Sequence, residues 1–262
     1  MTTPSLAQFL ETTEPVVRVR VTAVRGSAPR DAGTEMFVTP TAIFGTIGGG
    51  RLEFEVIASA RKLCLAGDQA TELDIALGPE IGQCCGGRVA VSLRQLTDTG
   101  RRLACKSEAM ATARHPHVYI LGAGHVGRAL ARFFQFLPVR CILIDARKEE
   151  LSLCDAQVEK RLSALPEADI QQAPPNSAFI VLTHDHALDF LLTSEALERG
   201  DAAYVGLIGS LTKRVKFSRF HAAHSIQKDI SGLTCPIGAT ASADKRPEVI
   251  AAFVAAEIMT RL

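Results

Sequence analysis

The sequence predicts an α/β protein in which a mixed α+β domain is followed by a doubly wound parallel sheet. In the N-terminal part, short segments alternate between apolar and polar residues and are separated by glycine-rich turns, which is typical of half-buried strands. In the C-terminal part, continuous apolar runs alternate with amphipathic segments. A GxGxxG motif joins the first apolar run to the amphipathic segment that follows it. We therefore expect an N-terminal domain over residues 1–105 and a Rossmann-like domain over residues 116–262, joined by a polar linker or linking helix over 106–115.

Composition narrows the class of protein. A chain of 262 residues is long enough for two domains. A formal net charge of +1 gives no electrostatic footprint for nucleic acid or for an anionic membrane. No basic start with a long apolar run is present, and no stretch approaches the roughly 18 apolar residues of a membrane span, so we expect a cytoplasmic protein. The seven cysteines are odd in number and scattered, without paired CxxC spacing, and we expect reduced thiols.

The N-terminal domain is expected to contain two helices and several strands. Periodicity predicts helices over 5–12 and 51–63, and strands over 16–24, 36–39, 42–47, 71–77 and 88–93. The strands over 36–39 and 42–47 should form a hairpin around Pro40.

The C-terminal domain opens with its most specific motif. An apolar strand from His117 leads into Gly122, Gly124 and Gly127, which form a GxGxxG turn before an amphipathic helix. The following strand ends at Asp145, where an acid can bind ribose hydroxyls, while the helix N-terminus favours phosphate. Further strands are expected over 178–183 and 203–208, and helices over 187–198, 212–223 and 247–262.

Two adjacent thiols, Cys84 and Cys85, lie between paired glycines in the loop that joins the strands 71–77 and 88–93. Consecutive Cα atoms are about 3.8 Å apart, below the spacing of an unstrained disulfide, so these cysteines should be free thiols. Gly82, Gly86 and Gly87 allow a ligand to approach the main chain closely. The alternative is that both cysteines are small buried hydrophobic residues beside a glycine turn.

Other residues suit an anion. Gly48, Gly49 and Gly50 open a helix, where backbone N–H groups and the helix dipole favour negative charge; a tight turn without a ligand is equally consistent. Arg30 lies in an exposed loop between strand patterns. His125, inside the GxGxxG turn, would either hinder a dinucleotide or contact the phosphate of another ligand.

Polar residues also follow later strands of the C-terminal domain. His184 and His186 could bind a metal only with a third ligand that the sequence does not identify, and Asp185 is better explained as a helix N-cap. Lys213 and Arg214 open a helix, where they would face either a phosphate or solvent.

Taken together, six motifs resemble the xanthine dehydrogenase accessory protein family, XdhC/CoxI, over nearly the whole chain. They are Arg25-Gly-Ser-Ala-Pro-Arg30, Gly45-Thr-Ile-Gly-Gly-Gly-Arg-Leu-Glu53, Gly82-Gln-Cys-Cys-Gly-Gly87, Leu121-Gly-Ala-Gly-His-Val-Gly127, Thr183-His-Asp-His186 and Gly206-Leu-Ile-Gly-Ser210. The resemblance implies a non-catalytic chaperone that binds the molybdenum cofactor (molybdopterin), holds it during sulfuration and inserts it into apo-xanthine dehydrogenase. A cysteine desulfurase would be the sulfur donor.

The resemblance also assigns roles to residues. Cys84 and Cys85, with Gln83 and Gly86 beside them, would hold or shield the molybdenum, since thiolates are soft ligands. The cofactor phosphate would bind at Arg30, at Gly48–Gly50 or at the turn over Gly122, Gly124, His125 and Gly127 that precedes Asp145. One departure from the family pattern lies at 239–244, where a glycine-rich turn is missing.

Two other functions stay open. An NAD(P)-dependent oxidoreductase would use the Rossmann-like domain with Asp145 on the ribose. A thiol-dependent sulfurtransferase would carry a persulfide on Cys84 or Cys85, with Arg88 as the nearby cation that lowers the thiol pKa. The apolar helix over 247–262 suits either a homodimer interface or an intramolecular core.

Overall fold

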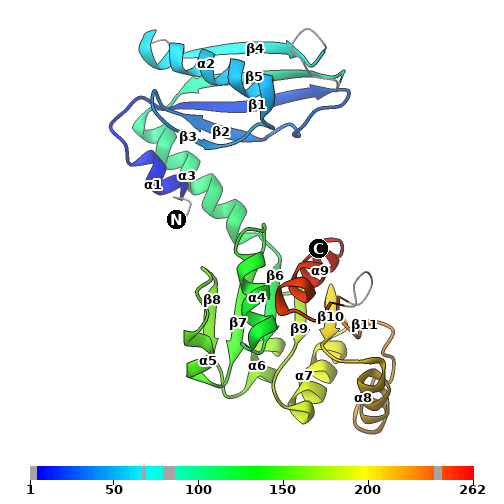
Figure 1. The fold of residues 1–262 in the computed structure, drawn as a ribbon. Coiled ribbons are helices and arrows are strands. Elements are labelled where there is room, and N and C mark those ends of the chain that lie inside the picture. Colours follow the sequence, from blue (N-terminus) through cyan, green and yellow to red (C-terminus); the bar gives the residue numbers. More distant parts are fainter. Residues whose placement is uncertain (1–4, 67–68, 79–85, 239–243) are drawn as a thin grey trace. The chain divides into compact units, whose positions relative to one another are not determined.

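The computed structural model describes residues 5–66, 69–78, 86–238 and 244–262 (Figure 1). It divides into two compact units, Met1–Met110 and Ala111–Leu262. Gln83, Cys84 and Cys85 lie outside the described residues, and so does most of the departing loop over 239–244.

Unit 1 is built on a five-stranded antiparallel sheet with the strand order β3-β2-β1-β5-β4. The strands are β1 (Val17–Arg25), β2 (Glu35–Val38), β3 (Ile43–Gly45), β4 (Ala70–Ala76) and β5 (Arg88–Gln95). Along β1 the valines at 17, 19 and 21 are buried, whereas Arg18 and Arg20 point to the other face. The alternation seen in the sequence therefore identified the strands correctly.

Helices cover parts of both faces of this sheet (Figure 1). On one face α2 (Gly50–Ala66) packs Leu52, Val56 and Ala60 against the buried valines of the sheet. A smaller cluster forms where α1 (Leu6–Leu10) and α3 (Asp98–Ala113) meet Phe37. Ser5 caps α1 in a capping box, so this helix begins where the predicted helix over 5–12 begins. The segment expected as a linker, 106–115, begins as the last part of α3.

Unit 2 is a doubly wound parallel sheet, as predicted, and its strand order is β11-β10-β9-β6-β7-β8. Its strands are β6 (His117–Leu121), β7 (Arg140–Asp145), β8 (Glu159–Leu162), β9 (Ala178–Val181), β10 (Tyr204–Leu207) and β11 (Leu233–Thr234). The helices are α4 (His125–Phe134), α5 (Lys148–Ser152), α6 (Pro166–Gln171), α7 (His186–Glu198), α8 (Leu211–His224) and α9 (Pro247–Met259). The crossovers between parallel strands place α4 and α9 in one apolar cluster and α6, α7 and α8 in the other.

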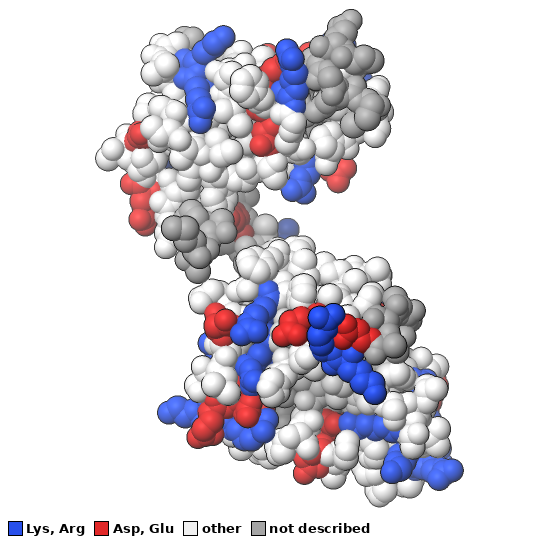
Figure 2. All heavy atoms as spheres, viewed as in Figure 1, with Lys and Arg blue, Asp and Glu red and all other residues white. Residues whose placement is uncertain are grey.

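Four elements of unit 2 were not predicted from the sequence, namely α5, β8, α6 and β11. The edge strand β8 consists of Glu-Lys-Arg-Leu. Its charged side chains disfavour pairing of this sheet edge with another chain, and they also remove the apolar residues by which a strand is recognised in a sequence. On the face seen in Figure 2, basic and acidic side chains are interspersed over both units. No helix among the described residues is long and apolar enough to cross a membrane.

Candidate functional site

Three of the sequence motifs meet at one end of the unit 1 sheet. The loop after β1, residues 25–30, forms a bridge from Ser27 to Gly86, directly beyond the thiol segment. A Cβ atom on Gly87 would lie 2.0 Å from the carbonyl oxygen of Ser27, so glycine is required there. Gly26 has a φ of +72°, and a Cβ atom on it would lie 3.2 Å from the Cα atom of Gly87. The loop and the glycines after the thiols are therefore packed backbone against backbone.

The same loop contacts the triglycine turn. A Cβ atom on Gly48, whose φ is +119°, would lie 2.5 Å from the Cγ atom of Pro29 and 3.5 Å from the Cγ atom of Arg30. Segments that are far apart in the sequence thus share one location, with residues 25–30 between the other two. We call this assembly of residues 25–30, 45–53 and 86–87 the motif cluster.

The triglycine turn has an internal anion, which the sequence analysis did not identify. One carboxylate oxygen of Glu53 accepts hydrogen bonds from the Thr46 hydroxyl and from the N–H groups of Ile47 and Gly49, the latter two at 3.0 Å. Burial alone would raise the pKa of Glu53, but these hydrogen bonds outweigh it and hold the pKa below its ordinary value. An acid in the first turn of a helix after a glycine turn is the sequence signal that could have revealed this contact.

This contact bears on the anion site expected at Gly48–Gly50. The N–H of Gly49 is donated to Glu53, and the N–H of Gly48 is donated to the Thr46 hydroxyl at 3.0 Å. Arg30 and Arg25 of this loop are both exposed and make no ion pair with any described residue, so both guanidinium groups are available to a ligand.

The ends of the thiol segment are fixed. The N–H of Leu77 donates to the Gly87 carbonyl at 2.8 Å, and the N–H of Gly86 donates to the Leu77 carbonyl at the same distance. Arg88, expected as a cation beside the thiols, donates to Asp74 on the neighbouring strand at 2.7 Å. Gln83, Cys84 and Cys85 lie within the segment that the structure does not describe.

Among the described cysteines, burial raises the pKa of three thiols, Cys64, Cys141 and Cys235. A raised pKa suppresses the thiolate, which is the nucleophilic and metal-binding form. All three cysteines are members of the apolar clusters of their units.

The GxGxxG turn of unit 2 has the geometry of a phosphate-binding turn. Cβ atoms would lie 2.4 Å from the Leu182 carbonyl oxygen at Gly122 and 2.0 Å from the Gly122 carbonyl oxygen at Gly127, so both glycines are required by packing. Gly124 instead borders open space and is the N-cap of α4, without a side-chain cap. His125, the first residue of α4, is exposed. A ligand can therefore approach the helix N-terminus at Gly124.

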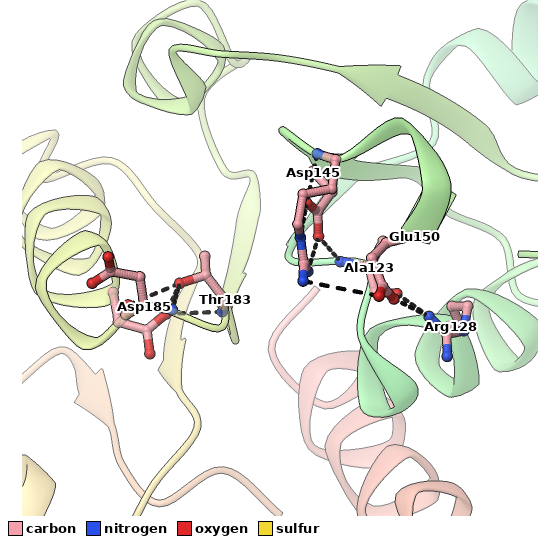
Figure 3. A network of polar contacts seen from close by, with 8 residues as sticks. Ala123, Arg128, Asp145, Glu150, Thr183 and Asp185 are labelled. Atoms are coloured by element: carbon pink, nitrogen blue, oxygen red, sulfur yellow. Dashed lines mark hydrogen bonds and ion pairs between the residues drawn. The ribbon is translucent and has the colours of Figure 1, made fainter. Parts of the chain in front are cut away.

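Asp145, expected to bind a ribose, is already engaged (Figure 3). Its carboxylate accepts from the Ala123 N–H at 2.8 Å and from two nitrogens of the Arg147 guanidinium at 2.9 and 3.0 Å. Burial acts to raise the pKa of Asp145, but the hydrogen bonds from Arg147 and Ala123 outweigh it and lower the pKa. The sequence analysis missed Arg147, although its position two residues after the acid is visible in the sequence.

A second arginine braces the same turn (Figure 3). Arg128 donates to the Ala123 carbonyl and to Glu150, both at 2.6 Å. Glu150 also lies 3.9 Å from Arg147, so one carboxylate links both arginines. The conformation of the GxGxxG turn is thus stabilised by the side chains of Arg128, Asp145 and Glu150.

The segment after β9 is held by a buried ion pair. Asp185 is the N-cap of α7, as predicted, and accepts from the N–H groups of Ala187 and Leu188. Asp189, 1% exposed, accepts from the Thr183 N–H and from the Lys213 ammonium, at 2.8 and 2.5 Å. Neither expectation for Lys213, a phosphate or solvent, includes this partner.

Three further residues singled out in the sequence can be placed. Arg214 donates to the Leu233 carbonyl at 2.7 Å, which joins α8 to β11. Among the described residues, His184 and His186 belong to no group of three or more His, Cys, Asp or Glu side chains that could hold a metal ion.

A small apolar pocket lies at the carboxyl ends of β6, β7 and β9, where ligands bind in open α/β sheets. Its volume is about 30 Å³, far below the roughly 300–1,000 Å³ of typical small-molecule sites. It is lined by Leu121, Gly122, Ile144, Asp145, Ala146, Pro166, Thr183, His184, Leu188 and Leu192. In this conformation the pocket does not accommodate a nucleotide base.

Comparison with known proteins gives concordant results. The chain is 26% identical to the uncharacterized protein YqeB of Escherichia coli (strain K12), over 97% of its own length but only 44% of that relative. The chain therefore spans less than half of that protein. A crystal structure from Bacillus halodurans, described as a xanthine dehydrogenase, shares the fold with a TM-score of 0.82 over 98% of this chain and 94% of that chain, at 17% identity.

Family models match both units. Residues 9–75 match the model of the XdhC and CoxI family. This range of the chain contains the loop over 25–30 and the triglycine turn. Residues 118–258 match the model of the XdhC Rossmann domain. This range contains the GxGxxG turn and most of unit 2. The chain is thus a member of the XdhC and CoxI family.

Proposed function

We propose that the protein binds the molybdenum cofactor, holds it during sulfuration and delivers it to apo-xanthine dehydrogenase. The observation that carries the proposal is the motif cluster, in which residues 25–30 lie against both the triglycine turn and the glycines that follow the thiols. Membership of the XdhC and CoxI family supports it. A cysteine desulfurase supplies the sulfur in this proposal, and the protein itself acts as a chaperone without a catalytic residue.

The residues around the motif cluster fit the chemistry of this cofactor. Gly49 and Gly86, both with positive φ, border open space, so a flat ligand can approach the main chain there. Arg30 is exposed for the cofactor phosphate. Cys84 and Cys85 supply soft ligands or a shield for the molybdenum, with Gln83 beside them as a hydrogen-bonding group. The cofactor supplies the molybdenum centre, and the protein orients it and limits its exposure to water.

The oxidoreductase alternative finds less support. The oxygens with which Asp145 would bind a ribose accept instead from Arg147 and Ala123. A nicotinamide dinucleotide would have to displace the Arg147 guanidinium, which is held by two hydrogen bonds. The sulfurtransferase alternative differs from the chaperone in requiring turnover at Cys84 or Cys85.

Anaerobic co-elution of the reduced protein with molybdenum cofactor tests the proposal. The double variant Cys84→Ala/Cys85→Ala should stay folded and lose at least tenfold in cofactor affinity, because each soft ligand is replaced by a methyl group. Cys105→Ala, at a half-buried thiol of α3, is the matched control and should bind normally. Unchanged binding by the double variant would remove the thiols from the site. Tight binding of NAD(H) without cofactor binding would instead favour the oxidoreductase.

A further inference from the structure

The face of the unit 1 sheet opposite α2 carries a groove across its central strands. It is lined by Arg18, Arg20 and Thr22 of β1, Ser92 and Arg94 of β5 and Glu72 of β4, and its rim includes Gly33. The groove has a volume of about 510 Å³, within the range of small-molecule sites. We call it the arginine groove.

The arginines of this groove lie in an arrangement that is unfavourable without an anion. Arg18 and Arg94 are directly opposite each other on neighbouring antiparallel strands, a position where like charges destabilise a sheet. Arg20 lies opposite Ser92, beside this pair on the same face. Three guanidinium groups thus converge on two central strands.

The nearby carboxylates neutralise this charge only in part. Glu35 lies 4.0 Å from Arg18 and 3.7 Å from Arg20, beyond hydrogen-bond distance of either. Arg94 makes no ion pair with any described residue, although Glu72 also lines the groove. The groove therefore has a net positive charge and guanidinium donors that are free to bind an acceptor.

The backbone around the groove is shaped locally. The β1–β5 register shifts between Val21 and Ala23, which places a β-bulge at Thr22 on the groove side. Gly33, with φ +95°, donates to the Val21 carbonyl at 2.8 Å and holds the next loop against the rim. Bulges of this kind commonly re-aim side chains beside binding sites.

We infer that the arginine groove binds the phosphoryl group of a small ligand. Guanidinium forks match phosphate oxygens in a bidentate geometry, and the volume suits a small molecule better than a macromolecular surface. None of the three arginines of the groove belongs to the motif cluster, although the rim of the groove at Gly33 continues the loop that carries Arg30. The inference therefore goes beyond the proposed function and does not depend on it.

Calorimetric titration of the full chain with inorganic pyrophosphate tests the inference. Arg18→Gln and Arg94→Gln should each weaken binding at least tenfold, since each removes a charge-assisted donor pair. In the absence of pyrophosphate the same variants should unfold at the same or a higher temperature, because the cross-strand repulsion is relieved. Arg61→Gln, at an exposed arginine of α2 on the opposite face, is the control and should bind like the unaltered chain.

The other outcomes are equally decisive. Pyrophosphate binding that Arg18→Gln and Arg94→Gln leave unchanged, or no binding at all, would overturn the inference. Tighter binding of AMP than of inorganic phosphate would identify a phosphate ester as the ligand, and the reverse order would identify a free phosphate. Cys84→Ala/Cys85→Ala should bind pyrophosphate normally, so failure of the cofactor proposal and failure of this inference are distinguishable.

Discussion

The carboxylate of Glu53 organises the triglycine turn from within the chain. It accepts from the N–H groups of Ile47 and Gly49 and from the Thr46 hydroxyl, all within one motif. A ligand anion is therefore not needed to satisfy these donors. The turn in turn positions Gly48 against Pro29, so a single side chain influences the shape of the motif cluster.

Glu53→Gln should destabilise the protein by about 1–2 kcal/mol at pH 7, because hydrogen bonds to a charged acceptor are stronger than those to a neutral one. The pKa of Glu53 is lowered in the folded chain, so its contribution is present above the ordinary value of 4.5 and is lost as the pH falls through the lowered value. Denaturant unfolding of both proteins from pH 7 to pH 3 measures the difference, which should shrink in acid.

Glu55→Gln is the matched control for this prediction. Glu55 is on the same helix but forms only an exposed ion pair with Arg51, at 3.0 Å. Such pairs contribute about 0.5 kcal/mol or less. An equal loss of stability in both variants, or a loss that does not change with pH, would contradict the role given to Glu53.

At the scale of elements, the motif cluster depends on contacts between loops rather than between strands. The loop after β1 meets the β4–β5 connection through the Ser27 to Gly86 bridge, and Gly87 leaves no room for a side chain. The six-stranded sheet of unit 2 shows the same principle, because its GxGxxG turn is fixed by Gly122 and Gly127 against the neighbouring backbone. Close backbone packing thus defines both candidate sites.

Gly87→Ala should separate the loop after β1 from the β4–β5 connection. The new Cβ atom would lie 2.0 Å from the Ser27 carbonyl oxygen, and overpacking of this kind typically costs about 1–3 kcal/mol. Thermal unfolding measures the loss of stability. Gly78→Ala, at the other end of the connection and bordering open space, should be nearly neutral. Equal stability of the two variants would show that the backbone adjusts freely around Ser27.

Much of this architecture could be predicted from the sequence, since period-two alternation and apolar runs mark β1, β5 and β6 clearly. The GxGxxG turn was identified because its glycines have packing roles that leave a fixed spacing. The partners of Asp145 and Lys213 were not predicted. Residue spacing in the sequence does not show which basic side chain binds each carboxylate in the folded chain.

At the scale of the whole molecule, each unit has its own core. The apolar clusters around Val19 and Phe37 draw only on residues of unit 1, and those around Ile120 and Phe179 draw only on residues of unit 2. No described cluster mixes the two units. Units with separate cores are expected to fold independently.

A fragment of residues 111–262 should therefore unfold cooperatively on its own, as measured by circular dichroism during heating. A shorter fragment that ends at residue 246 lacks α9 and with it the core residues Ala251, Val254 and Ile258, so it should fail to fold. If the longer fragment were unfolded, its core would depend on unit 1, contrary to the clusters described above.

The hydrogen bonds between Leu77 and the pair Gly86 and Gly87 have a consequence for chain entropy. They close the connection that contains Cys84 and Cys85 into a short loop, whose ends are already paired by the antiparallel register of β4 and β5. The entropy cost of bringing these ends together is thus met by folding of the sheet and does not recur when a ligand binds.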